Sequence, residues 1–265
     1  MFRSIKTRSD HLYFDKAVGR VGSESLRHFH DAVEIYYLME GKCNYFIGEH
    51  FYEVVAGDVI IIPGGTMHRT NYGVRPHSRA LVNFPLSALP PSIAELIPSI
   101  GHLYRNTGVK RRIDEIFLRI EDEYALGDSL SEDAIICYIT ELLLIFARSK
   151  TEVETKSEEK GPVNRAVEYI KENYSTDIKL SEVSALSNVS AEHLSRAFKK
   201  ETGFGFNEYL TLTRLKKAEY MLRNEPGRSV GEIAYACGFN DSNYFSFKFK
   251  KLYGVSPLSL RKTAK

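Results

Sequence analysis

The chain has 265 residues, of which 43% are hydrophobic and 26% charged, with a formal net charge of +2. This composition excludes disordered and fibrous proteins and leaves room for two globular domains. The first ten residues lack the apolar core of a signal peptide, and the most apolar run, ELLLIFA at 141–147, is too short to span a bilayer. Cys43, Cys137 and Cys237 form no CxxC pair, which argues against a disulfide framework. We therefore expect a cytoplasmic protein without a membrane partner.

The first part of the chain predicts a small antiparallel β-barrel. Runs rich in β-branched and aromatic residues alternate with turn residues, at 33–39, 44–48, 50–55, 57–63 and 79–84. Tyr36, Tyr37 and Tyr45 on these runs are candidates to stack on a sugar or an aromatic ligand.

Two groups of residues in this region follow fixed intervals. They are Gly22, His28, His30, Glu34 and Gly41, and then Gly57, Pro63, Gly65, His68 and Asn71. The intervals resemble both motifs of the cupin barrel family, except for a slip of one residue at Asn71. The resemblance implies a cupin-like fold for about residues 10–85.

The histidines and the glutamate of these motifs can hold a ligand or a metal. His28 and His30 are expected to point the same way from one strand, and Glu34 and His68 would complete a set suited to Zn, Fe, Ni or Mn. His28, His30, Glu34, Tyr36 and His68 are the candidate ligand-contacting residues, and we expect that no cofactor is required. A divalent metal held by His28, His30, Glu34 and His68 is one alternative, and a purely structural barrel is another.

Two amphipathic helices are predicted at 111–126 and 131–148. Their apolar faces consist of Ile113, Ile116, Phe117 and Ile120, and of Ile135, Ile139, Leu142, Leu143 and Phe146. These faces either close the barrel or pair with a second subunit, and we predict a homodimer. Residues 149–161 alternate in charge and predict a linker, which separates a sensing and dimerisation domain at 1–148 from a second domain at 162–265.

The part after the linker is basic. From Gly161 onward it carries 17 Lys and Arg against 11 Asp and Glu, whereas the rest of the chain carries 19 against 23. This asymmetry favours contact with a polyanion such as nucleic acid.

This part is also predicted to be helical throughout, and it contains an internal repeat. Residues 183–189 correspond to residues 233–239, and residues 190–203 correspond to residues 241–254. Each copy predicts a short helix, a turn and a second helix, which is a helix-turn-helix. Between the copies, residues 206–224 predict a connecting helix of about 28 Å.

Turn and cap residues support this division. Asn188 and Gly238 occupy the two turns, where a left-handed conformation is tolerable. Ser190 and Asp241 are predicted to cap the second helices, and Ser181 and Ser229 the first ones. Pro162 suits the first turn of the helix after the linker.

The second helix of each copy has a face opposite its core residues. It carries Glu192, Ser195, Arg196 and Lys199 in the first copy, and Asn243, Ser246, Phe247 and Lys250 in the second. Arginine can bind guanine and asparagine can bind adenine, while lysines near helix ends suit phosphates. We predict DNA contacts from Ser190, Glu192, His193, Ser195, Arg196, Lys199, Lys200, Asp241, Asn243, Ser246, Phe247, Lys250 and Lys251.

This half resembles the DNA-binding domain of the AraC/XylS family of bacterial transcription regulators. The resemblance is carried by LSEVSALSNVSAEHLSRAFKKETGFGFNEYLTLTRLKKAEYML and by SVGEIAYACGFNDSNYFSFKFKKLYGVSPLSLR. It implies one monomer that reads two adjacent major grooves. The family often has arginine at the position of Phe247. Phenylalanine can press against a thymine methyl; alternatively, Phe247 packs on the protein or contacts only sugar.

Together these patterns predict an α+β chain with a cupin-like barrel, flanking helices and an all-α domain that contains two helix-turn-helix motifs. The predicted function is sequence-specific regulation of promoter DNA, as an activator in contact with RNA polymerase. A small-molecule effector, with a carbohydrate as the candidate, would control it from the barrel. Such a regulator acts in the bacterial cytoplasm, at the nucleoid. The alternative is a metal-dependent cupin enzyme with a DNA-binding tail, whereas we expect no enzyme.

Overall fold

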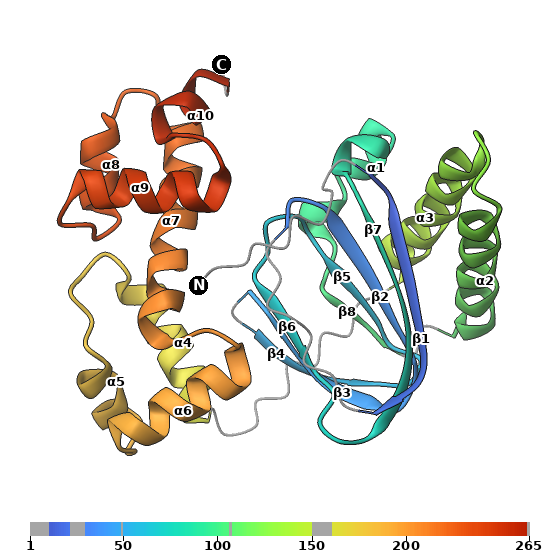
Figure 1. Cartoon of the computed structure of the whole chain (residues 1–265), viewed down its shortest axis with the longest axis horizontal. Coiled ribbons are helices and arrows are strands. Elements are labelled where there is room, and N and C mark those ends of the chain that lie inside the picture. The colour runs from blue at the N-terminus through green and yellow to red at the C-terminus, as the bar shows by residue number, and fades with distance from the viewer. Residues whose placement is uncertain (1–10, 22–29, 49, 106–107, 150–160, 264–265) are drawn as a thin grey trace. The chain divides into compact units, whose positions relative to one another are not determined.

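The computed structural model describes residues 11–21, 30–48, 50–105, 108–149 and 161–263. The chain divides into two compact units, residues 1–156 and 157–265. Strands with flanking helices make up the first unit and helices the second (Figure 1), which confirms the predicted fold class. The predicted domain limits at 148 and 162 stay predictions, because residues 150–160 of the linker lie outside the described residues.

Two antiparallel sheets form the first unit. One has the strand order β1-β7-β2-β5-β8 and the other the order β4-β3-β6. The strands are β1 (Tyr13–Val21), β2 (Val33–Glu40), β3 (Lys42–Ile47), β4 (His50–Val55), β5 (Val59–Ile62), β6 (His68–Asn71), β7 (Pro76–Phe84) and β8 (Leu103–Tyr104).

Strand β2 lies at the centre of the larger sheet and is buried on both faces. Because side chains alternate along a strand, Ile35 and Tyr37 belong to one apolar cluster, whereas Tyr36 and Leu38 belong to another. The second cluster includes Tyr45 of β3 and lies between the two sheets. Strand β2 therefore lines the barrel interior with one face and packs against helices outside the barrel with the other.

Those helices are α2 (Lys110–Leu126) and α3 (Ser131–Arg148). All nine residues of the predicted apolar faces are buried there, in the same cluster as Ile35 and Tyr37. The faces thus close the barrel unit within one chain, which is the first of the two predicted alternatives. Three short helical segments precede α2, namely η1 (Leu86–Ala88), α1 (Pro91–Ala94) and η2 (Ile97–Ser99). Within the described residues, no helix combines the length and apolarity needed to cross a membrane.

The second unit contains both predicted helix-turn-helix motifs, α5–α6 and α8–α9, with α7 between them (Figure 1). Its helices are α4 (Pro162–Asn173), α5 (Leu180–Leu186), α6 (Ala191–Thr202), α7 (Phe206–Asn224), α8 (Val230–Ala236), α9 (Ser242–Tyr253) and α10 (Pro257–Thr263). The connecting helix α7 has the predicted bounds. Leu194 and Phe198 of α6, and Phe245 and Phe249 of α9, are fully buried and anchor the second helix of each motif.

Hydrogen bonds at the helix starts confirm three of the four predicted caps. Ser190 Oγ accepts the His193 N–H at 3.1 Å, and Asp241 Oδ1 accepts the N–H groups of Asn243 and Tyr244 at 2.7 and 3.2 Å. Ser229 and Glu232 form the predicted capping box. The prediction for Ser181 is wrong, because α5 begins one residue before it and the cap position falls on Lys179.

The cap at Asp241 yields a testable expectation, because its carboxylate accepts two of the N–H groups that no helical carbonyl satisfies. We expect Asp241→Ala to lower the free energy of unfolding of the helical unit by about 0.5–2 kcal/mol. Urea unfolding followed by circular dichroism at 222 nm measures the change. Asp241→Asn keeps a capping oxygen and should cost less, and equal losses in the two variants would contradict the role of the cap.

Candidate nucleic-acid interface and barrel site

The predicted reading faces of α6 and α9 are available to a partner. In α6, Glu192, His193, Arg196, Lys199 and Lys200 are exposed and Ser195 is half-buried; in α9, Asn243, Phe247, Lys250 and Lys251 are exposed and Ser246 is half-buried. The buried residues of both helices lie on the opposite face. Each motif therefore presents a polar stripe of the kind that enters a major groove.

Arg196 forms an ion pair with its neighbour along α6. Its Nη2 lies 3.6 Å from Oε1 of Glu192, and the two side chains are 74% and 79% exposed. An exposed pair of this kind contributes only about 0.3–0.5 kcal/mol. Moving the guanidinium from Glu192 to a base edge therefore costs little free energy.

Phe247 occupies the matching place on α9 and is 62% exposed. The core face of this helix is already filled by Phe245 and Phe249, so Phe247 lies outside the core of the helical unit. This exposure favours a role for Phe247 in contact with a partner over the predicted alternative in which it packs on the protein. Contact with DNA, through a thymine methyl or only through sugar, stays a prediction.

The lysines and the caps lie at opposite ends of the two reading helices. Lys199 and Lys200 are in the last turn of α6, and Lys250 and Lys251 in the last turn of α9. At the helix starts, the side chains of Ser190 and Asp241 already accept backbone N–H groups. DNA contacts at these ends would therefore come mainly from the other exposed residues in the first turn of each helix.

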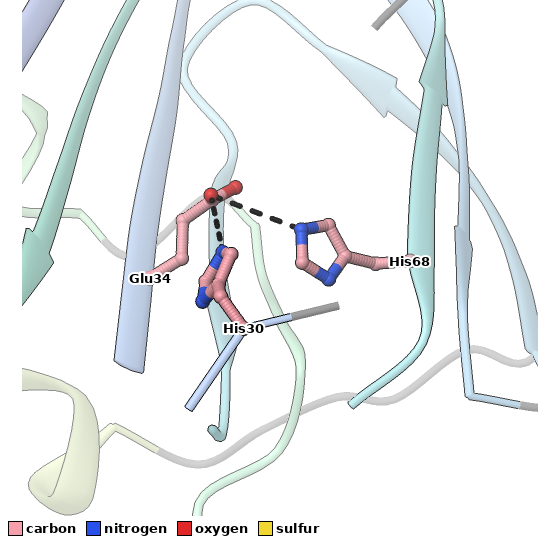
Figure 2. A group of neighbouring side chains, drawn as sticks. All are labelled: His30, Glu34 and His68. Atoms are coloured by element: carbon pink, nitrogen blue, oxygen red, sulfur yellow. Dashed lines mark ion pairs between the residues drawn. The ribbon is translucent and has the colours of Figure 1, made fainter. Parts of the chain in front are cut away.

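In the barrel unit, three of the four predicted metal-ligating residues come together. His30, Glu34 and His68 are all buried, and one donor atom from each lies within 4.8 Å of the others. Glu34 Oε2 lies 3.5 Å from His30 Nε2 and 3.8 Å from His68 Nε2. Figure 2 shows the two imidazole rings converging on this carboxylate. His28 lies outside the described residues.

Three separate elements hold the cluster. Glu34 is on β2 and His68 begins β6, whereas His30 precedes β2, so the prediction that His30 projects from a strand is wrong. The loop before β6 fixes His30 through a hydrogen bond from the Gly65 N–H to the His30 carbonyl at 2.7 Å. The glycine next to it, Gly64, has no room for a Cβ, which would lie 2.1 Å from the Asp31 carbonyl oxygen.

The hydrogen bonds around the cluster place a proton on Nδ1 of both histidines. His30 Nδ1 donates to the Ala32 carbonyl at 2.9 Å and His68 Nδ1 to the Thr66 carbonyl at 2.8 Å, because a carbonyl can only accept. Both Nε2 atoms therefore face Glu34. Burial lowers the pKa of His30, but the hydrogen bond to Glu34 and its charge outweigh burial and raise the pKa overall.

Tyr45 completes the polar group around Glu34. Its hydroxyl donates to Glu34 Oε1 at 3.0 Å. Burial, and then the charge of Glu34, raises the pKa of Tyr45 well above its usual value, so the hydroxyl keeps its proton and remains a donor. Glu34 thus receives contacts on both carboxylate oxygens.

The donor set fits a metal of the predicted kind. With bonds of about 2.1 Å, neighbouring ligand atoms of a tetrahedral site lie about 3.4 Å apart, close to the two separations measured from Glu34 Oε2. Histidines that bind a metal usually donate their other ring N–H to a carbonyl or carboxylate, as His30 and His68 do through Nδ1.

Other polar and aromatic side chains separate into those inside and outside the barrel. Tyr36 is buried inside, where its ring meets that of Tyr45 edge-on at 5.2 Å. Tyr37 points the other way, stacks on Phe117 and donates a hydrogen bond to Asp114 of α2. The suggestion that Tyr37 stacks on a ligand is therefore wrong for the barrel interior.

Asn83 is an interior residue that the sequence did not suggest. It lies on β7 opposite Glu34, so both side chains are on the same face of the sheet. Its Oδ1 is buried and has no hydrogen-bond partner among the described residues. The available signal was an amide after the apolar residues ALV in the run RALVNF, and this signal does not show the face on which the amide lies.

Comparison with known families agrees with both units. The AraC-like ligand binding domain matches residues 22–139, and a helix-turn-helix domain matches residues 183–263. The chain belongs to the AraC/XylS family of transcription regulators. It is an AraC-family DNA-binding regulator with a ligand-binding domain, and its relatives are regulators rather than enzymes.

Two relatives of this AraC-family chain match along most of its length. The Msm operon regulatory protein of Streptococcus mutans is 27% identical over 94% of this chain and 93% of its own length. The transcriptional activator RhaS of Escherichia coli is 26% identical over 88% of this chain and 86% of its own length. Among solved structures, the C-terminal domain of AraT from Geobacillus stearothermophilus is 40% identical over 38% of this chain and 84% of that chain, with a TM-score of 0.37.

Proposed function

We propose that this AraC-family regulator activates transcription from a promoter and that a small molecule in its barrel controls it. The observation that carries the proposal is the presence, in one chain, of two exposed reading helices and a separate barrel with a buried polar cluster. Activation is supported by the similarity to a protein named as a transcriptional activator. Such a regulator works at the nucleoid, in the cytoplasm.

Each of the two motifs would contact both bases and phosphates of the DNA. Arg196 suits guanine and Asn243 suits adenine, each through two hydrogen bonds, whereas the lysines at the ends of α6 and α9 suit phosphates. Helix α7, at about 1.5 Å per residue over its 19 residues, separates the motifs on the scale of one turn of the duplex, about 34 Å.

Binding to DNA upstream of the chain's own gene tests this function. The purified protein should bind that region more tightly than random duplexes of equal length, with the salt concentration stated. Equal affinities at moderate salt would count against sequence-specific regulation.

Phe247 should give the second motif a preference for thymine. We expect Phe247→Arg to change that preference towards guanine, because arginine donates two hydrogen bonds to the guanine edge while phenylalanine contacts only the thymine methyl. Selection of duplexes from a random library, before and after the change, measures the preference under α9. An unchanged preference would indicate that Phe247 packs on the protein or contacts only sugar. The preference under α6 serves as an internal control.

The effector site would lie among His30, Glu34, Tyr36 and His68, joined by His28 if that residue reaches the cluster. We propose a carbohydrate, because hydroxyl groups pair well with carboxylate, imidazole and amide groups, and sugars stack on aromatic rings. The buried amide of Asn83 is a further partner, since a bound hydroxyl would satisfy its Oδ1.

A divalent metal is the second candidate for this site, and the geometry of the two Nε2 atoms and Glu34 favours it. His30, Glu34 and His68 would hold the metal, which would supply a Lewis-acid contact to an oxygen of the effector. His30 and His68 would be oriented by their bonds to the Ala32 and Thr66 carbonyls, and Tyr45 would orient Glu34.

Thermal unfolding with a panel of ligands separates these two occupants. A sugar at 100 times its dissociation constant should stabilise the barrel unit by about 2.7 kcal/mol. We expect one monosaccharide to raise the melting temperature of protein stripped of metal with a chelator. If only Zn²⁺, Ni²⁺ or Mn²⁺ raises it, the metal is the occupant, and no shift from either class would contradict a ligand site in the barrel.

The homodimer and the contact with RNA polymerase also stay proposals. Because the apolar faces of α2 and α3 are buried within one chain, a dimer would use other surfaces of this unit, where Leu118, Leu126 and Leu130 are exposed. Sedimentation equilibrium of the full chain, with Leu118→Glu as a variant, would test that surface.

A further inference from the structure

One turn position carries a different backbone requirement in each of the two helix-turn-helix repeats. Asn188 and Gly238 correspond to each other, and both have a positive φ, 54° and 82°. Asparagine tolerates this conformation, and Asn188 is exposed. At Gly238 a Cβ would lie 2.8 Å from the Tyr174 carbonyl oxygen, 2.9 Å from that of Ser175 and 2.9 Å from Arg214 Nε. Crowding, in addition to the backbone angle, therefore requires glycine at the second turn.

The atoms that crowd Gly238 belong to other parts of the helical unit. Tyr174 and Ser175 follow α4 and lead into the first motif, whereas Gly238 lies between α8 and α9 of the second motif. The turn of the second motif is thus packed directly on the backbone that enters the first.

Arg214, in the middle of α7, joins the same two places. Its Nε donates to the Tyr174 carbonyl and its Nη2 to the Thr176 carbonyl, both at 2.7 Å. Its guanidinium carbon also lies 6.0 Å from the centre of the Phe239 ring, next to Gly238. The planar guanidinium of Arg214 therefore binds the segment that leads into the first motif and also lies against the turn of the second motif.

Among the described residues, the turn of the first motif makes a different contact, which stays on one side of α7. Arg165 of α4 donates from Nη2 to the Ser187 carbonyl at 3.2 Å, and both residues lie on the amino-terminal side of α7. The bridge through Arg214 and Gly238 is therefore a feature of the second turn, and it couples the two motifs in addition to their connection through α7.

We propose that Arg214 and Gly238 are positioning residues, which fix the placement of α9 relative to α6 and so set the half-site spacing that the protein accepts on DNA. This inference rests on the proposed DNA reading and adds a structural element that selects spacing. A helix joined at each end by a short loop can hinge, whereas a second point of attachment removes that freedom. A rigid pair of modules gains effective concentration at one spacing and loses it at others.

The test uses the full chain and a duplex that the wild-type protein selects from a random library. Footprinting locates the two contacted segments, and 1, 2, 3 or 5 base pairs are then inserted between them. The wild-type protein should lose affinity at least roughly tenfold on insertion of 2 base pairs, because the second motif is turned away from its site. Arg214→Gln should bind the original duplex roughly tenfold more weakly and show a loss of less than about threefold on the same insertion.

Matched variants make this result specific. Arg214→Lys keeps the charge but replaces the planar fork of Nε and Nη2 with a single nitrogen, so it should also broaden the spacing profile. Gly238→Asn, which introduces the residue of the first turn, should do the same by steric displacement, whereas the reverse change, Asn188→Gly, should leave the profile unchanged.

Affinity for a duplex that contains only the segment under α6 reports whether that motif remains folded. It should be the same in Arg214→Gln, Arg214→Lys and wild-type protein. If it falls by the same factor as affinity for the whole site, Arg214 acts only on stability and the inference is overturned. Unchanged spacing profiles in both Arg214 variants would also overturn it. Failure of the wild-type protein to select any duplex would instead contradict the proposed function.

Discussion

Replacing Arg196 with alanine is expected to weaken binding to the selected site by about 1–3 kcal/mol and to relax the base preference under α6. The planar guanidinium of arginine can donate two hydrogen bonds to guanine in the major groove. Its present partner, Glu192, is an exposed neighbour that releases it at little cost. Fluorescence anisotropy with the selected duplex and with single-base variants of it measures both effects.

Lys250→Ala is the matched control for Arg196→Ala. Lys250 is exposed near the end of α9, where a lysine suits a phosphate, so its loss should weaken binding to all sequences alike. It should also reduce the slope of log affinity against log salt by about one. If both variants lost affinity equally for every sequence, Arg196 would have to be reassigned to phosphate contact.

Glu34→Ala is expected to destabilise the barrel unit by about 1–3 kcal/mol or more and to abolish the ligand response. The change leaves the buried Tyr45 hydroxyl and the two Nε2 atoms of His30 and His68 facing a space without an acceptor. Unsatisfied buried polar groups carry their full desolvation cost. Hydrogen exchange in increasing urea, followed by mass spectrometry, measures the protection of β2 and β6.

Glu34→Gln separates stability from binding. Its amide oxygen can still accept from Tyr45, so we expect a smaller loss of protection than in Glu34→Ala, whereas the ligand shift should be strongly reduced because the charge is gone. Peptides from α6 and α9 should be unaffected in both variants, since they belong to the other unit. A full ligand shift in Glu34→Gln would place the effector elsewhere.

The helical unit was largely predictable because its determinants are local. The spacing of Leu194 and Phe198, and of Phe245 and Phe249, reports one buried face per helix, and helix caps act within three residues of each helix start. The predicted capping roles of Ser190, Ser229 and Asp241 are therefore confirmed. The prediction for Ser181 was wrong because Lys179 and Ser181 are both polar and lie close together, so the sequence allowed two positions for the helix start. Only packing decides between them.

The barrel site was only partly predictable. Motif spacing brought His30, Glu34 and His68 to notice, but whether three separate elements converge depends on how the two sheets face each other. The face on which a strand residue lies also depends on register, since a shift of one residue reverses every side chain. Hence Tyr37 was grouped with Tyr36 and Tyr45 as a candidate ligand contact although it lies on the opposite face of β2 from Tyr36, and Asn83 was missed although it lies directly opposite Glu34.

The sequence by itself determined the two-part organisation, the repeated helix-turn-helix and the composition of both reading faces, because helix periodicity, turns and caps are encoded within a few residues. The tertiary structure alone decided which polar groups meet inside the barrel. It also showed that the apolar faces of α2 and α3 are buried within the chain. In the helical unit, it showed that Arg214 joins the segment entering the first motif to the turn of the second motif at Gly238. Each of these depends on contacts between residues far apart in the chain, and local sequence patterns carry no information on such distances.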